Sequence, residues 1–160
     1  MLHGSITPTD YLNAQRLHRA RYARGYVILC IFLILAAFVL AAFYQRHLGV
    51  IVGLVGGLGL TVEILIATVF LPWQVRRLHA QQKDLATPFN YSWDDEYLEV
   101  KGANGQAKRP WRNYAKYRED ERVFLVYHAD NIFEMLPKRW FKDEAQIAEF
   151  RQLADLVGKR

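Results

Sequence analysis

The side chains best suited to bind a ligand form two short groups, each of which places basic residues beside a tryptophan. The residues are Lys108, Arg109 and Arg112 around Trp111, and Lys138 and Arg139 before Trp140. A basic cluster with an aromatic ring suits an anionic lipid head group or an acidic protein partner. The alternative, which we favour, is a solvated edge with Trp111 and Phe141 in the core and Trp140 at the surface.

Glu63 is a charged residue inside a long apolar stretch. A carboxylate in hydrocarbon costs at least a few kcal/mol, so this side chain is expected to be neutral, paired or turned toward water. One hypothesis is a proton or ion site. Because neither apolar stretch offers a second ionisable group, and two helices make no pathway alone, we favour a structural role or a contact with another subunit.

Residues typical of catalytic sites are few. Ser5 and Ser92 lack the context of a nucleophile elbow, and the sequence has no phosphate-binding glycine motif. The acidic runs 94–96 and 119–121 are explained as turns between strands. Cys30 is the single cysteine, and no two of the five histidines are spaced as metal ligands. The sequence therefore predicts no enzyme, no cofactor and no metal site.

Two apolar runs predict a pair of helices that would place the chain in a membrane. Tyr26–Tyr44 has no charged residue, glycine or proline, and Val50–Pro72 follows after the short turn Gln45–Gly49. At about 1.5 Å per residue, each run spans the roughly 30 Å hydrocarbon core of a bilayer. So short a turn makes the helices antiparallel neighbours, and residues 26–73 are predicted to form a transmembrane hairpin.

Small residues mark the predicted contact between these two helices. Gly49, Gly53 and Gly57 form two overlapping GxxxG spacings, and Ala37 and Ala41 offer a similar strip on the first helix. Such strips let helix backbones approach closely in a membrane. We favour packing within the hairpin over packing against a second copy of the chain.

The net charge of +5 predicts how the hairpin is oriented. From Pro88 onward 13 basic residues balance 13 acidic ones, whereas before Pro88 there are 8 basic and 3 acidic residues. Of those eight only Arg46 lies in the turn, and positive charge marks the cytoplasmic side of membrane segments. We expect both termini in the cytoplasm, with the charge serving topology and attraction to anionic lipid rather than nucleic acid.

The rest of the chain divides into three parts around the hairpin. Residues 1–25 are predicted to form a basic N-terminal helix, capped by Thr7 and preceded by loose residues 1–6. This helix either lies at the membrane interface or packs on the soluble domain. Residues 74–87 form a juxtamembrane linker, and residues 88–160 form a cytoplasmic domain.

Alternating patterns predict several antiparallel strands in that domain. Phe89, Tyr91 and Trp93 alternate with polar residues, and Asn104-Gly105 is a hairpin signal. Further strands are predicted around Leu98 and Val100 and at residues 106–109, 114–118, 123–127 and 132–136.

A terminal amphipathic helix completes the predicted fold. Asp143 and Gln146 resemble a capping box, and Ile147, Phe150 and Ala154 follow at helical spacing. A helix over one open side of a small, strongly bent antiparallel sheet is the pleckstrin-homology-like arrangement. The predicted fold class is a membrane α-helical hairpin plus an α+β domain of this kind.

Four stretches carry a family resemblance. They are the early segment ITPTDYLNAQ, the two membrane helices, the position of Trp111, and the segment LPKRWF at residues 136–141. With the acidic-capped helix at Asp143, these resemble the YcxB-like proteins of bacteria over nearly the full length. The resemblance implies a pleckstrin-homology-like domain anchored in the bacterial inner membrane, and it implies no enzyme chemistry.

Three functions stay open at this point. The first is a non-enzymatic inner-membrane protein whose cytoplasmic domain binds a protein partner, a second copy or anionic lipid. The second is an immunity protein that protects against an antibacterial toxin. The third is a small transport-related subunit that uses Glu63.

Overall fold

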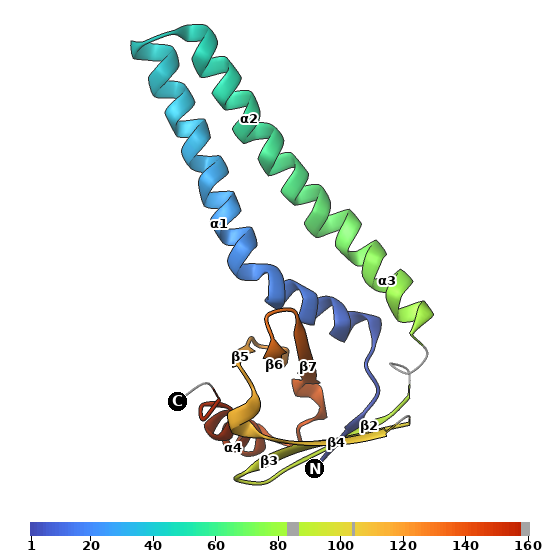
Figure 1. The fold of residues 1–160 in the computed structure, drawn as a ribbon. Helices are drawn as coiled ribbons and strands as arrows, with labels where there is room; N and C mark the ends of the chain where they lie inside the picture. The colour runs from blue at the N-terminus through green and yellow to red at the C-terminus, as the bar shows by residue number, and fades with distance from the viewer. Residues whose placement is uncertain (83–86, 104, 158–160) are drawn as a thin grey trace. The chain divides into compact units, whose positions relative to one another are not determined.

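The computed structural model describes residues 1–82, 87–103 and 105–157. Contacts divide the chain into two compact units, unit 1 with residues 1–18 and 75–160 and unit 2 with residues 19–74, and each is described by itself. The elements in chain order are β1 (Leu2–Gly4), α1 (Pro8–Phe43), α2 (Arg46–Leu65), a π-helical turn (Ile66–Phe70), α3 (Leu71–Gln81), β2 (Phe89–Trp93), β3 (Tyr97–Gly102), β4 (Gly105–Pro110), a 3-10 turn (Trp111–Asn113), β5 (Lys116–Glu119), β6 (Val123–Ala129), β7 (Ile132–Pro137), a second 3-10 turn (Lys138–Trp140) and α4 (Glu144–Ala154) (Figure 1).

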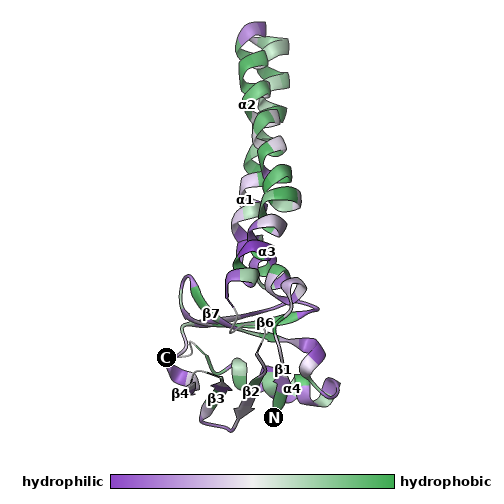
Figure 2. Ribbon diagram, turned by 90° about the vertical axis from the view of Figure 1, so that its right-hand side faces the viewer, coloured by the Kyte–Doolittle hydropathy of each residue, from purple (hydrophilic) through white to green (hydrophobic). Residues whose placement is uncertain are grey.

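Unit 2 holds most of two long apolar helices. Pro8–Phe43 and the helical path Arg46–Gln81 are each 36 residues long and apolar enough to cross a membrane. Only 11% and 6% of their most apolar windows are buried, and Figure 2 shows hydrophobic residues along α2 and the adjoining part of α1. The core helix of a soluble protein would be mostly buried, so these exposed apolar faces fit a membrane protein.

Small residues bring the two helices of unit 2 together near the turn. A Cβ atom built on Gly49 would lie 2.6 Å from the Ala37 carbonyl oxygen and 2.6 Å from the Ala41 Cβ. A Cβ built on Gly53 would lie 3.3 Å from the Ala37 Cβ. The contact at Gly49 has room only for glycine, because the facing backbone atoms cannot move aside.

Farther along α2 the contact runs through different glycines from those that the sequence suggested. A Cβ on Gly57 would meet nothing within 4 Å, so this residue lies off the contact. Gly56 and Gly59 lie on it instead, with Cβ positions 3.0 Å from the Cys30 carbonyl oxygen and 2.7 Å from the Cys30 sulfur. A helix turns once in about 3.6 residues, so the face turned toward α1 passes from Gly53 to Gly56 rather than to Gly57.

The strands of unit 1 form two antiparallel sheets, where the sequence analysis expected one strongly bent sheet. Four strands pair in the order β1-β2-β3-β4, and three pair in the order β5-β6-β7. The break between them falls after Pro110, where the chain enters the 3-10 turn Trp111–Asn113.

The predicted alternation is confirmed in β2. Tyr91 lies opposite Val100 and Trp93 lies opposite Leu98, so these large side chains share one face of the sheet. The pairing of β3 with β4 follows the hairpin signal, although Asn104 itself lies outside the described residues. At the other end of unit 1, Asp143 caps α4 by accepting the Gln146 backbone N–H at 2.8 Å, as predicted.

Strand β6 joins the two halves of the core. Phe124 and Val126 belong to a cluster with residues of the four-stranded sheet and α4, including Phe150. Val123 and Leu125 point to the other face and belong to a second cluster. A strand buried on both faces reads as a continuous apolar run, which is the pattern that predicted this strand.

The N-terminal residues belong to the domain. Leu2–Gly4, expected to be loose, form β1 along β2, and Leu2 is buried in the core. A three-residue strand is too short to show an alternating pattern, so the sequence carries no signal for it. Of the two placements left open for the next helix, the first turns of α1 pack on the domain, with Ala14 buried beside Leu125.

The glycine contact of the hairpin is testable with a matched pair of substitutions. Gly49→Val should destabilise the hairpin, because its side chain meets the backbone of the other helix, whereas Gly57→Val meets open space. The measurement is the SDS concentration at which the full chain in mild detergent loses helical circular dichroism. We expect a lower midpoint for the first variant and an unchanged one for the second, and equal midpoints would contradict the packing.

Candidate functional site

The second basic group of the sequence, Lys138 and Arg139, lies in the 3-10 turn after β7 and is engaged inside unit 1. Lys138 Nζ donates to Glu119 Oε1 at 2.6 Å, and Arg151 Nε of α4 donates to Glu119 Oε2 at 2.8 Å. The Glu119 side chain is 18% exposed. Because the Glu119 carboxylate binds both Lys138 and Arg151, these contacts tie β5, the 3-10 turn and α4 together. Lys138 is thereby engaged and offers little charge to a ligand.

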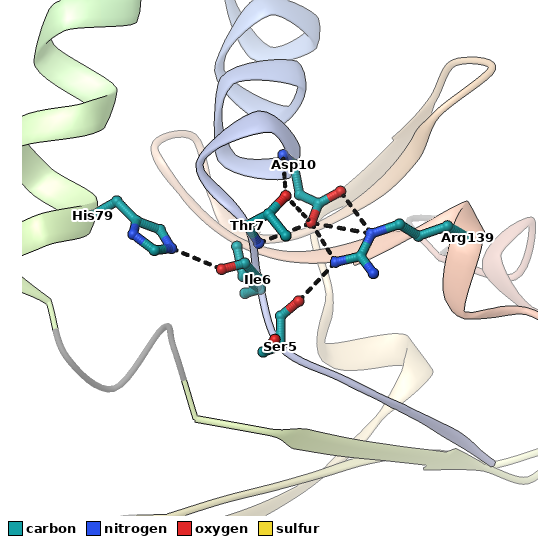
Figure 3. Close-up of polar contacts among 6 residues, drawn as sticks. All are labelled: Ser5, Ile6, Thr7, Asp10, His79 and Arg139. Atoms are coloured by element: carbon teal, nitrogen blue, oxygen red, sulfur yellow. Dashed lines mark hydrogen bonds and ion pairs between the residues drawn. The ribbon is translucent and has the colours of Figure 1, made fainter.

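Arg139 makes the most connected contact of unit 1 (Figure 3). Its guanidinium donates to Asp10 Oδ2 at 2.7 Å and to the Ser5 carbonyl oxygen at 2.8 Å. Asp10 also accepts the Thr7 hydroxyl at 2.6 Å and the Thr7 backbone N–H at 2.9 Å. Thr7 Oγ1 accepts the Asp10 N–H in return at 3.2 Å, which makes Thr7 the predicted cap of α1.

The surroundings keep this Asp10 carboxylate ionised. Burial alone would raise the pKa of Asp10, but hydrogen bonds from Arg139 and Thr7 outweigh it, so the pKa lies below its ordinary value. The resulting stabilisation is present at neutral pH and is lost only as the pH falls through that lowered pKa. The same segment is held from α3, where His79 Nε2 donates to the Ile6 carbonyl oxygen at 2.8 Å (Figure 3).

Trp140 is half-buried rather than fully at the surface. Its ring centroid lies 6.1 Å from that of Tyr91, and a Cβ built on Gly4 would lie 2.2 Å from the indole nitrogen. Glycine at position 4 therefore lets β1 pass against the indole ring. Phe141 is buried in the core, which matches the role that the sequence analysis gave it.

The three cations of the first basic group are all exposed. Lys108 and Arg109 lie on β4, and Arg112 follows in the 3-10 turn. Lys108 Nζ is 3.8 Å from an Asp94 carboxylate oxygen, a long contact between two half-exposed side chains. Such a pair contributes about 0–1 kcal/mol, so these cations stay accessible to an incoming anion.

Trp111 fixes the first basic group to the domain. The indole is 2% exposed and donates its Nε1–H to the Asp94 carbonyl oxygen at 2.9 Å. Its ring packs edge-on against Phe150 of α4, with centroids 5.6 Å apart. Of the six residues proposed from sequence as contacts, the structure thus leaves Lys108, Arg109 and Arg112 at the surface beside a rigid base, with Lys108 over the Tyr97 ring and Arg109 over the Tyr114 ring on the opposite face of β4.

In unit 2, Glu63 is paired. Arg19 Nη2 donates to both Glu63 carboxylate oxygens, at 3.0 and 3.1 Å, and the Glu63 side chain is 12% exposed. From the sequence, Arg19 was expected to be one of the basic residues that flank the apolar runs, and no second ionisable group was expected near Glu63. The long Arg19 stem reaches along the apolar surface to the carboxylate. A paired charge explains Glu63 without an ion pathway.

Unit 1 contains a pair of titratable side chains, His128 and Glu134. The sequence gives only a faint signal of this pair, namely an acidic residue inside the apolar strand β7. His128 Nε2 of β6 lies 2.9 Å from Glu134 Oε1, and the Tyr114 hydroxyl donates to the same oxygen at 3.2 Å. Burial raises the pKa of Glu134 to about 7, against the Tyr114 hydrogen bond and the positive charge of Arg109. Burial also lowers the pKa of His128, so the uncharged form of each group is favoured.

Comparison with known proteins gives a family match for part of the chain. Residues 93–154 match the YcxB-like protein family, which confirms over this range the resemblance noted in the sequence. The matched range runs from the end of β2 to the end of α4 and includes both basic groups. No curated protein and no solved structure matches the chain significantly.

The buried Glu134 predicts a pH dependence of domain stability. Between the ordinary pKa of 4.5 and the raised pKa of about 7, the folded state binds more protons than the unfolded state. The contribution of Glu134 should therefore fall as pH rises, by at most about 1.4 kcal/mol per pH unit. Glu134→Gln should remove this slope in urea unfolding of the domain, followed by tryptophan fluorescence of the full chain at pH 5, 6 and 7.

The matched control for this experiment is Glu121→Gln, which changes an exposed carboxylate. Its slope of unfolding free energy against pH should follow that of the wild type. If Glu134→Gln and wild type lose stability equally between pH 5 and pH 7, the raised pKa is wrong.

Proposed function

We propose that the chain is a non-enzymatic, membrane-anchored protein whose α+β domain is an interaction module for a protein partner. The observation that carries the proposal is the difference between the two basic groups. Lys138 and Arg139 form short ion pairs with Glu119 and Asp10, at 2.6 and 2.7 Å, whereas in the exposed group around Trp111 the Lys108 contact with Asp94 is 3.8 Å long. A rigid domain that leaves three neighbouring cations accessible suits recognition of an acidic surface.

The architecture of unit 1 supports a pleckstrin-homology-like arrangement as part of this proposal. A four-stranded and a three-stranded antiparallel sheet share one core, and α4 packs into that core through Ile147 and Phe150. Folds of this kind present their loops and sheet edges on a stable scaffold, which is where binding residues are best placed. One fold serves many functions, so the exposed basic group, and not the fold, is the feature that supports binding.

Location in the inner membrane, with both termini in the cytoplasm, is also proposed. Its support is the charge asymmetry, because seven of the eight basic residues before Pro88 flank the outer ends of the apolar runs. The pairing of Glu63 with Arg19 supports an anchor rather than a transport subunit. The hairpin then anchors the chain in the membrane.

A protein partner is favoured over anionic lipid by the charge balance of the domain. From Pro88 onward 13 basic residues meet 13 acidic ones, so this part carries no net attraction to a negative membrane. Its exposed basic group is a local feature that fits a local acidic patch on another protein. Lipid binding and a toxin partner, which would make the chain an immunity protein, are distinguishable outcomes of the same experiment.

The test is site-specific photo-crosslinking of the full chain in native membranes. A photoreactive residue at Asn113, which is exposed beside Arg112, should give a discrete protein adduct. Charge reversal of Lys108, Arg109 and Arg112 to Glu should lower the adduct yield at least fivefold, because repulsion replaces attraction. The control Lys142→Glu, at an exposed residue before α4, should leave the yield unchanged.

Mass spectrometry of the adduct identifies the partner and separates the alternatives. An adduct whose yield does not change when the charges of the basic group are reversed would contradict the proposed site. An absent protein adduct, combined with binding to phosphatidylglycerol vesicles that charge reversal abolishes, would reassign the site to anionic lipid.

A further inference from the structure

Strand β4 forms one edge of the four-stranded sheet. The strand order is β1-β2-β3-β4, and Figure 2 shows β4 outermost beside β3. All of its residues from Gly105 to Arg109 are exposed. Among the described residues its ladder partner is β3 alone, so the second side of β4 carries backbone groups that face outward. An exposed edge of this length is a template for another strand.

The register shows which backbone groups of β4 face outward. The Trp111 N–H donates inward, to the Glu96 carbonyl oxygen at 3.0 Å, while Pro110 has no N–H and lies opposite Tyr97. N–H groups along an antiparallel strand point alternately to the two sides. Counting back from Trp111, the inward groups are those of residues 109, 107 and 105. The N–H groups of Gln106 and Lys108 therefore point away from β3.

A hollow beside this edge offers room for a side chain. It is lined mainly by Phe89, Val100, Ala107 and the glycines at 102 and 105, and it measures about 380 Å³. Val100 and Ala107 lie opposite each other in the ladder, so the hollow opens on one face of the hairpin next to β4. In strand addition the backbone supplies affinity, and such hollows select alternate side chains.

Charge determines which strand this edge accepts. Lys108 and Arg109 lie on β4, and Arg112 follows directly. A second copy pairing through β4 would set these cations against their own counterparts, and like charges on facing strands are unfavourable. An extended segment with acidic side chains is attracted by the same residues. The edge thus disfavours self-association and favours an acidic partner.

We propose that β4 binds an extended acidic segment of a partner protein by strand addition, with one apolar side chain of that segment in the hollow beside Ala107. The inference rests on the proposed function and specifies how the exposed basic group works. The Gln106 and Lys108 backbones hydrogen-bond the added strand. Lys108 lies on the face opposite Ala107, so its side chain meets the carboxylates that alternate with the apolar residue in the hollow. A lipid head group has no peptide backbone that could form a ladder of hydrogen bonds with this edge.

The first test uses the full chain in detergent and the probe peptide acetyl-Glu-Val-Glu-Val-Glu-amide. The peptide should bind at least tenfold more tightly than its Lys-Val counterpart, measured by fluorescence anisotropy of a labelled probe. N-methylation of alternate peptide residues removes its backbone donors without changing its charge, and it should weaken binding at least tenfold. Equal binding of the methylated peptide would overturn strand addition without any change to the protein.

The second test uses Gln106→Pro with Gln106→Thr as its matched control. Proline is tolerated on an edge strand at a position whose backbone N–H faces solvent. The variant should therefore fold but lose one outward hydrogen-bond donor. We expect at least tenfold weaker peptide binding for Gln106→Pro, unchanged binding for Gln106→Thr, and unchanged thermal unfolding for both. A concentration-dependent dimer of the wild type that Gln106→Pro abolishes would instead identify a second copy as the occupant and overturn the proposal.

The two proposals fail in different ways in membranes. If charge reversal of the basic group abolishes the native adduct but Gln106→Pro does not, the interaction module stands and strand addition is wrong. If neither variant changes the adduct, the proposed function itself is wrong.

Discussion

The ion pair between Asp10 and Arg139 is the contact on which unit 1 depends most. It joins residues 129 positions apart and holds the first turn of α1 against the turn after β7. Ser5 and Thr7 hydrogen-bond to the same pair, and His79 of α3 hydrogen-bonds to Ile6 between them. The beginning of α1 and the end of α3 are thus both fastened to the β domain. Asp10 is 8% exposed, so removing its partner would leave a buried charge uncompensated.

This contact also illustrates how the chain sorts its charges. Three carboxylates, Asp10, Glu119 and Glu63, each meet a basic side chain that the sequence alone would assign to a ligand or to lipid. Outside these pairs, Lys108, Arg109 and Arg112 are exposed on β4 and the turn that follows, and the charge of Arg109 acts on the buried Glu134 by lowering its pKa. The proposed interaction surface therefore consists of cations outside these internal ion pairs, and β4, which carries two of them, supplies an open backbone edge.

Local patterns in the sequence were enough to predict the helices and most strands. The alternation of Phe89, Tyr91 and Trp93 and the two-sided apolar run at residues 123–127 reflect burial on one or both faces, which side-chain types record directly. The same patterns could not show that the strands divide into two sheets, because pairing depends on long-range contacts. The partner of Arg139, the contact of Glu134 with His128 at the register shift of β6, and the pairing of Arg19 with Glu63 are likewise set by tertiary structure. For the candidate contacts, the sequence therefore predicted the residues but not which of them form internal ion pairs.

Hydrogen–deuterium exchange of the full chain in detergent tests the central role of the Asp10–Arg139 pair most directly. In Arg139→Gln, the amides of Leu2–Gly4 and of the first turn of α1 should exchange at least tenfold faster than in wild type, because Asp10 loses its charge partner. Protection in β6 should persist, and the exposed-site control Arg109→Gln should match wild type. Unchanged exchange at the N-terminal residues of Arg139→Gln would contradict the account.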